Sequence, residues 1–332
     1  MKYLLDILRC PTSGQKLIFT STLESSNPDS GNKFVSGILA SEDGKYKYKI
    51  TNGIPSFIED SDTDSFGFQW SLFQKTQLDS FSGHNISESR FWQSTRWTPS
   101  ELKDKLVLDV GCGSGRFSEI ALNAGARVVA IDSSQAVDAC LSNFPNNPNI
   151  LIVRADIFSL PFDLESFDYI FSLGVIQHTI DPEKAFKSLI KFLNSDGKLC
   201  IDCYEKKWNT FILPKYLLRP LTKRVSNENL FSILKFFVAF LLSCSNLLSK
   251  VPIIGSFLKK IVPIANYHGI LPLSKEQHID WALLDTFDWL TPKYDYPQTY
   301  EKVKKWLSKS GLKDTEVIQN GHLIARGRKI RD

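Results

Sequence analysis

Several common features are missing from this sequence of 332 residues, and each absence narrows the class of protein. Asp6 interrupts the first apolar run and no small-residue cleavage site follows, so we predict no secretory signal. The net charge of +4 is too small by itself to indicate nucleic-acid binding. The sequence shows no internal repeat and no long low-complexity tract, and its length is enough for one large globular domain or two smaller ones.

Cysteine is present but forms no recognisable disulfide framework. The six cysteines are scattered, and Cys112 and Cys140 fall in predicted core elements. Cys200 and Cys203 lie inside a predicted strand, where they should point to opposite faces, which argues against metal or redox use. Free thiols are typical of a reducing compartment, so we expect a cytoplasmic protein.

Residues 105–204 alternate short apolar runs with helical patterns. Asp181 and Pro182 give a helix N-cap followed by proline at the first helical position. Strands that alternate with helices predict a parallel sheet with right-handed crossovers. The predicted strands are Lys105–Val110, Arg127–Ile131, Ile150–Val153, Phe167–Phe171 and Lys198–Cys203.

The C-terminal end follows a different pattern. A last helix is expected to end before Gly311, and two apolar runs then flank Asn320 and Gly321. Asn-Gly between such runs predicts a β-hairpin. The hairpin adds an antiparallel strand to the sheet, which a plain dinucleotide-binding domain lacks.

A glycine-rich loop follows the first strand of the alternating region. Gly111, Gly113 and Gly115 recur at every second position before a predicted helix, a setting that allows close backbone approach to a ligand. A dinucleotide fingerprint needs glycine where Arg116 stands. The spacing, with Asp109 two residues ahead, fits S-adenosylmethionine (SAM) instead. Asp109 is expected to accept from the ammonium of SAM, with capping of the loop as the alternative.

The ends of the next two strands carry further candidates. Asp132 is placed to bind both ribose hydroxyls, although NAD-binding proteins use an acid there too. Asp156 is placed to accept from the adenine amino group, and Ile157 to cover the ring. A simple turn role for Asp156 stays open.

Four motifs in order and spacing resemble the class I SAM-dependent methyltransferase family, over roughly residues 105–204 and the terminal hairpin. They are the glycine loop, Asp132, Ala155-Asp156 and residues 167–178. The resemblance implies an α/β fold of the Rossmann-like methyltransferase type, with a mostly parallel seven-stranded sheet and an antiparallel C-terminal hairpin. It also implies SAM as cofactor, methyltransferase activity, and cofactor contacts from Ser133 and Ser172.

His178 follows the fourth strand and is the leading candidate for a general base, because an imidazole titrates near neutral pH. Relatives often carry two adjacent histidines here, but Gln177 occupies the first position. The alternative is that His178 only packs near the next helix.

An acidic and aromatic cluster precedes the last helix, where relatives place substrate-contacting segments. A purely structural role for it is equally open. Its candidate substrate-binding residues are His278, Trp281, Tyr294 and Tyr296, and Asp285, Asp288 and Asp295 lie among them.

The expected acceptor is a small-molecule, sugar or lipid-like compound methylated on oxygen, with no nucleic acid. The alternative is a catalytically silent SAM-binding protein that acts as a membrane-associated partner. Arg116 and the hairpin disfavour an NAD(P) oxidoreductase.

Two pieces of residues 3–58, namely 4–11 and 48–55, resemble the small zinc-ribbon domain that accompanies some methyltransferases, but the metal ligands are lost. Cys10 remains, but Ser13 stands at its partner position, and Ala40 and Asp43 occupy the second pair, so no metal is expected. We therefore predict a degenerate ribbon-like β domain over 1–60 and an aromatic-rich linker or cap over 61–104. The methyltransferase domain then covers 105–332, with a helical insertion at about 206–290.

The segment 206–270 is apolar and basic. It holds ten Lys and Arg residues against one acid, Glu228. Residues 230–248 approach the length of a membrane span, but Lys235 and several polar residues interrupt them. The segment is either an interfacial element attracted to anionic lipid or a helical lid over the active site.

Overall fold

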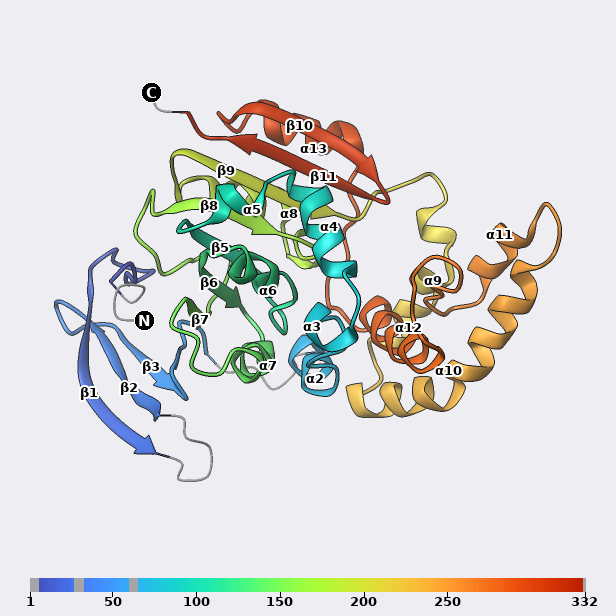
Figure 1. The fold of residues 1–332 in the computed structure, drawn as a ribbon, viewed down its shortest axis with the longest axis horizontal. Helices are drawn as coiled ribbons and strands as arrows, with labels where there is room; N and C mark the ends of the chain where they lie inside the picture. Colours follow the sequence, from blue (N-terminus) through green and yellow to red (C-terminus); the bar gives the residue numbers. More distant parts are fainter. Residues whose placement is uncertain (1–5, 27–32, 60–64, 331–332) are drawn as a thin grey trace.

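The computed structural model describes residues 6–26, 33–59 and 65–330. Two sheets organise these residues (Figure 1). The smaller sheet is antiparallel, with strand order β1-β2-β3-β4, and lies at one end of the molecule. Its strands are β1 (Leu17–Ser26), β2 (Lys33–Ser41), β3 (Lys47–Thr51) and β4 (Ile54–Pro55).

The larger sheet has seven strands in the order β10-β11-β9-β8-β5-β6-β7. The pairs among β5 to β9 are parallel, whereas β11 runs antiparallel to both β9 and β10. The predicted mostly parallel sheet with its closing hairpin is therefore confirmed. The strands are β5 (Leu106–Val110), β6 (Arg127–Asp132), β7 (Ile150–Arg154), β8 (Phe167–Ser172), β9 (Leu193–Cys203), β10 (Lys313–Asn320) and β11 (His322–Arg328).

Buried side chains of alternating residues form a separate core on each face of this sheet, as the two-residue period of a strand requires. On β5, Leu108 joins one core and Val107 the other. Cys203 and Cys200 divide between the same two cores, which confirms that the pair points to opposite faces. All six cysteines are free thiols.

Helices cover both faces. The Leu108 face packs against α8 (Pro182–Ile190) and α13 (Tyr300–Ser308), and the Val107 face against α4 (Ile86–Thr95), α6 (Arg116–Asn123) and α7 (Ala136–Asn143). Asp181 caps α8 as predicted, since its carboxylate accepts from the Lys184 amide. One predicted strand needs adjustment, because β9 begins at Leu193 and not at the predicted Lys198.

The segment between β9 and α13 is mostly helical and forms the end of the molecule opposite the small sheet (Figure 1). Its own core joins α10 and α12 to Phe73 near the N-terminal helices. Its helices are η2 (Thr210–Ile212), α9 (Pro214–Thr222), α10 (Asn227–Ser249), α11 (Gly255–Leu258), η3 (Lys259–Ile261) and α12 (Lys275–Leu290). The remaining helices are α2 (Ser65–Leu72), α3 (Asp79–Ser82), α5 (Pro99–Leu102) and η1 (Ile176–His178).

The small sheet is attached to the outer edge of the large one. Ser56 pairs with Arg154 at the end of β7, and Leu8, Leu39 and Ile50 join the core on the Leu108 face. Cys10 is buried and its sulfur contacts the Tyr48 hydroxyl. No three potential His, Cys, Asp or Glu ligands gather in the described ranges, and the absence of zinc stays a prediction.

Candidate active site

A cavity of about 1800 Å³ opens at the carboxyl ends of β5, β6 and β8. Ligand pockets usually measure roughly 300–1000 Å³, so this one has room for a cofactor and a second molecule. The strand ends line one half, which we call the cofactor half. Residues of α2, α9 and α12 line the other, which we call the acceptor half.

The glycine loop forms the floor of the cofactor half, and none of its three glycines has room for a side chain. Gly111 has φ +79°, and a Cβ there would collide with the side chain of Val175. Gly113 has φ +53°, and its Cβ would lie 2.9 Å from the Trp70 ring of α2. Gly115 does not line the cavity but begins α6 with φ +90°. The loop is therefore a backbone surface on which a ligand can lie closely.

Asp132 ends β6 inside the cavity, as predicted. Its carboxylate accepts from the Gly113 amide at 3.0 Å and from the Ser134 amide at 2.9 Å. These bonds fix the orientation of the carboxylate, and each oxygen can accept more than one hydrogen bond. Exposed Ser133 lies beside it in the cavity. The pair fits the diol of a ribose.

Asp156 and Ile157 also line the cavity, at the end of β7. The Asp156 carboxylate accepts from the Phe158 amide at 3.0 Å, which is the turn role left open by the sequence. The turn also points the group into the cavity, so the two roles are compatible. A carboxylate beside a buried aliphatic side chain fits an aromatic base that carries an amino group.

Besides Gly115, two residues predicted to contact the cofactor lie outside the cavity lining. Asp109 is 2% exposed and accepts from the Ser118 hydroxyl at 2.6 Å. Burial raises the pKa of Asp109 to about 7. Ser172 is fully buried and donates to the Val110 carbonyl at 2.9 Å. The structure thus corrects the direct contact predicted for Ser172, because its hydroxyl joins β8 to β5 instead.

His178 lies in η1, directly beyond β8, and faces the cavity. Its Nδ1 atom is 3.0 Å from the carbonyl oxygen of Tyr294. A carbonyl only accepts, so Nδ1 carries the hydrogen. Nε2 is buried and has no hydrogen-bond partner within the described residues. Phe66 and Tyr204 pack edge-on against the ring, at centroid distances of 5.5 and 5.6 Å.

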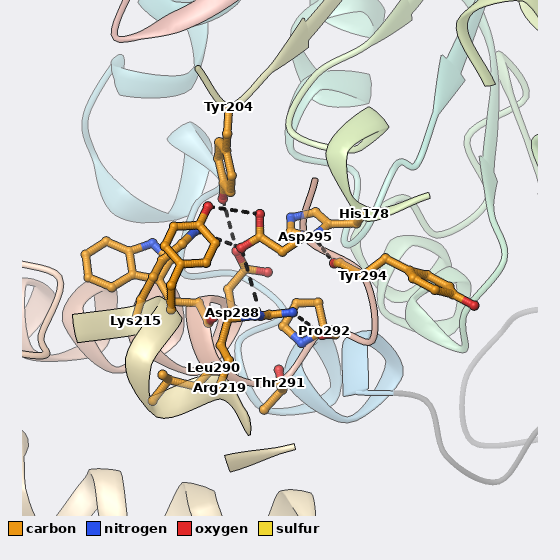
Figure 2. Close-up of polar contacts among 12 residues, drawn as sticks. His178, Tyr204, Lys215, Arg219, Asp288, Leu290, Thr291, Pro292, Tyr294 and Asp295 are labelled. Carbon is orange, nitrogen blue, oxygen red and sulfur yellow. Dashed lines mark hydrogen bonds and ion pairs between the residues drawn. The ribbon is translucent and has the colours of Figure 1, made fainter. Parts of the chain in front are cut away.

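A charged cluster lies next to His178, where α9, α12 and the segment before α13 meet (Figure 2). Asp295 forms an ion pair with Lys215 at 2.9 Å and lies 3.9 Å from Arg219. The Tyr204 hydroxyl donates to Asp288 at 3.4 Å. Burial raises the pKa of Asp288, whereas the neighbouring His178 ring and the positive charge of Lys215 oppose that rise. Asp288 is therefore placed to balance a cation at His178.

A second polar group lies deeper in the acceptor half. Asp285 accepts from the Tyr267 hydroxyl and, at 3.3 Å, from Gln77. Burial raises the pKa of Asp285 to about 6, and the charge of Asp288 adds to the rise. The Arg116 guanidinium lies 5.4 Å above the Trp281 ring, and burial lowers the pKa of Arg116 to about 10.

The four residues predicted to bind substrate divide into two groups. Trp281 and Tyr294 line the cavity, and the Trp281 indole donates to the Thr76 carbonyl at 3.1 Å. His278 and Tyr296 do not line it. His278 points back and accepts from the Tyr267 amide at 3.1 Å, and Tyr296 is 45% exposed. The structure therefore corrects the prediction that His278 and Tyr296 contact the substrate directly.

Several residues of the cavity were not predicted. Tyr204 directly follows the end of β9, so the rule that singled out Asp132 and Asp156 would have found it. Trp70, Arg90 and Lys215 come from α2, α4 and α9. Only packing over long sequence separations brings them to the cavity, and no local pattern marks them.

Comparison with known proteins finds similarity to methyltransferases. A family model described as a methyltransferase domain matches residues 108–201. A tRNA U34 carboxymethyltransferase from Hahella chejuensis is 27% identical over 240 residues, which cover 69% of this chain and 68% of that protein. A ubiquinone biosynthesis O-methyltransferase from Coxiella burnetii is 31% identical over 113 residues, covering 33% and 48%. The chain thus spans about half the length of the second relative.

A solved SAM-dependent methyltransferase from Mesorhizobium loti shares 15% identity with this chain. The match covers 74% of this chain and 98% of that one, with a TM-score of 0.43.

The strand order, the glycine loop and the family match together define a SAM-dependent methyltransferase. Within that class, the chain carries the class I core, and SAM is its cofactor. The cavity fits SAM through a glycine-rich floor, a carboxylate at the ribose position and an apolar cover at the base position.

Proposed function

We propose that this methyltransferase acts on a hydroxyl oxygen of a small or lipid-like acceptor, with His178 as the general base. The observation that carries the proposal is the buried Nε2 atom of His178, which faces the cavity and has no hydrogen-bond partner among the described residues. Since Nδ1 holds the hydrogen, a neutral ring leaves its lone pair on Nε2.

This arrangement supports methylation of an alcohol or phenol. SAM, when bound, supplies a methyl group on a positively charged sulfur, and the pair of electrons in the broken carbon–sulfur bond stays with the sulfur. His178 Nε2 takes the hydroxyl proton while the acceptor oxygen bonds to the methyl carbon. Asp288 offsets the positive charge that the imidazole gains, since the two groups interact.

The acceptor half is lined by aromatic and aliphatic side chains around a few polar groups, which is typical of sites for small organic ligands. Phe66, Trp281 and Tyr294 supply flat surfaces, and Ile264 and Leu271 supply aliphatic ones. The name of the Coxiella burnetii relative supports oxygen as the accepting atom. The name of the Hahella chejuensis relative makes tRNA the competing acceptor.

The test uses SAM with a ¹³C-labelled methyl group. The full chain is incubated separately with a lipid extract, a polar small-molecule extract and total tRNA, and products are examined by NMR. We expect label in one of the first two fractions, at the chemical shift of a methyl carbon bonded to oxygen. Label in tRNA alone, or on nitrogen or carbon, would overturn the proposal.

A further inference from the structure

The helical end of the molecule exposes many large apolar side chains. Phe236 of α10 is 79% exposed, and Ile253, between α10 and α11, is fully exposed. We call these side chains the apolar end. They are Ile233, Phe236, Phe237, Phe240 and Leu247 of α10, followed by Ile253, Ile254, Phe257 and Ile261. Exposed apolar surface on this scale is uncommon unless it meets a partner.

The exposed residues of α10 are not its packing face. Leu230, Leu234, Val238 and Leu242 form a buried stripe that packs with α12 residues such as Phe287. Ile233, Phe236, Phe237 and Phe240 recur at i, i+3, i+4 and i+7, so they form a second, outward stripe. A helical lid over the active site would need only the buried stripe, so a lid role does not account for the outward stripe.

The same region shows how α10 would lie on a membrane. This helix has 23 residues and contains an 18-residue window with a mean hydropathy of 1.9, so its length and composition would permit it to cross a bilayer. Of the residues in that window, 28% are buried. However, its buried stripe holds it against α12, whose Asp285 and Asp288 line the cavity. Because α10 is packed against a helix that lines the cavity, it would lie along a membrane surface rather than cross the membrane.

Positive charge surrounds the apolar end. Of the ten basic residues in 206–270, Arg219 is buried and Lys215 is paired with Asp295 inside the molecule. Lys223 and Arg224 are exposed just before α10, Lys235 lies on its solvent side, and Lys250 follows its end. Glu228 is the single acid in this stretch of sequence. The apolar end is thus complementary to a surface that is both apolar and anionic.

We infer that the apolar end docks on an anionic lipid membrane. The Phe and Ile side chains enter the boundary between headgroups and acyl chains, and the basic side chains face the lipid phosphates. A protein partner would meet the apolar stripe equally well, but the exposed basic residues before, on and after α10 favour lipid.

The docked orientation also bears on the acceptor, a point that rests on the proposed function. Lys260 and Ile270 are exposed and also line the cavity. The cavity therefore reaches the surface next to the apolar end, so an acceptor held in the membrane can enter without crossing water. This narrows the acceptor class to lipid-like compounds.

The experiment is flotation of the full chain with vesicles of phosphatidylglycerol and phosphatidylcholine, compared with phosphatidylcholine alone, at low and high salt. We expect flotation with the anionic vesicles that weakens as salt rises. Each basic residue near an anionic surface contributes roughly fivefold, so changing Lys223, Arg224, Lys235 and Lys250 to Glu should weaken partitioning at least 100-fold. Changing Phe236 and Phe240 to Ser should also release the protein.

Matched variants elsewhere control for charge and apolarity. The charge control reverses four exposed charges near α13 by changing Lys302, Lys304, Lys305 and Lys309 to Glu. The apolar control removes two exposed apolar side chains through Leu164→Ser and Ile330→Ser. Both controls should float like the wild type.

A protein that stays soluble throughout, or forms a stable dimer lost on Phe236→Ser, overturns the inference. Calorimetric SAM binding by every variant separates this result from a failure of the methyltransferase assignment.

Discussion

The two halves of the cavity are built by different means. The cofactor half uses backbone and side chains at the ends of neighbouring parallel strands, so Gly111, Asp132 and Asp156 are placed by sheet register alone. The acceptor half uses side chains from α2, α9 and α12, held together by packing between distant parts of the chain. The difference shows that the strand ends supply one half, while helices from distant parts of the chain supply the other.

A change at His178 gives the strongest test of the difference between the cofactor half and the acceptor half. His178→Ala removes the proton acceptor, so turnover should fall by roughly 10²–10⁴. Affinity for SAM should stay within about twofold, because His178 acts on the second substrate. Kinetics and calorimetry on the same preparation measure both quantities. His84→Ala, in a histidine that contacts Gln277 instead, is the control. Equal loss of turnover and SAM binding would show that His178 is structural.

The buried carboxyls of the two halves should give different pH dependences of stability. Burial raises the pKa of Asp109 to about 7 and that of Asp285 to about 6. A raised carboxyl pKa means that the folded state binds more protons, so stability falls as pH rises from the unfolded pKa of about 4 to the folded value.

These two carboxyls should therefore lower the stability of the wild type as pH rises to 7, and their contribution should change little above it. Asp109→Asn should reduce this pH-dependent loss in the free energy of unfolding by up to about 4 kcal/mol. The decline that remains comes from Asp285 and should end near pH 6. Urea unfolding between pH 4 and 8 measures the curves, with Asp314→Asn on the surface as control. An unchanged curve for Asp109→Asn would contradict the assigned burial effect.

Rigidity of the cofactor half is tested at Gly111. Gly111→Ala adds a Cβ that collides with Val175 at a φ of +79°, so strain and overpacking should cost roughly 2–4 kcal/mol. SAM binding should become undetectable and the melting temperature should fall. Gly14→Ala is the matched control, with a similar φ of +72° and no atom within 4 Å of the added Cβ. If the two variants behaved alike, the close approach to Val175 would have no importance.

The smallest effect is expected at Asp132. Asp132→Ala should weaken SAM binding by roughly 1.5–3 kcal/mol, the usual contribution of hydrogen bonds to a charged group. Asp132→Asn keeps one acceptor oxygen and should lose less. Turnover at saturating SAM should change far less than after His178→Ala. Calorimetry gives the affinities, and unchanged binding in Asp132→Ala would remove Asp132 from the cofactor site.

The sequence was most informative where neighbours in the chain determine the outcome. Strand ends and the glycine loop are local, so the sheet and the placements of Asp132, Asp156 and Ile157 were predictable. His278 was misplaced because sequence proximity to Trp281 says nothing about which side of α12 each residue occupies. Trp70 and Lys215 were missed because they reach the cavity only after α2 and α9 pack against the rest of the fold.

One helix contacts both halves. Trp70 of α2 lies over Gly113, and Phe66, one turn earlier, packs against His178. A ligand that holds α2 in place from the cofactor side therefore also holds the wall around the base. Such coupling is thermodynamically reciprocal: the factor by which SAM raises affinity for the acceptor equals the factor by which the acceptor raises affinity for SAM. The order in which the two molecules arrive can then change the path to the ternary complex but not its stability.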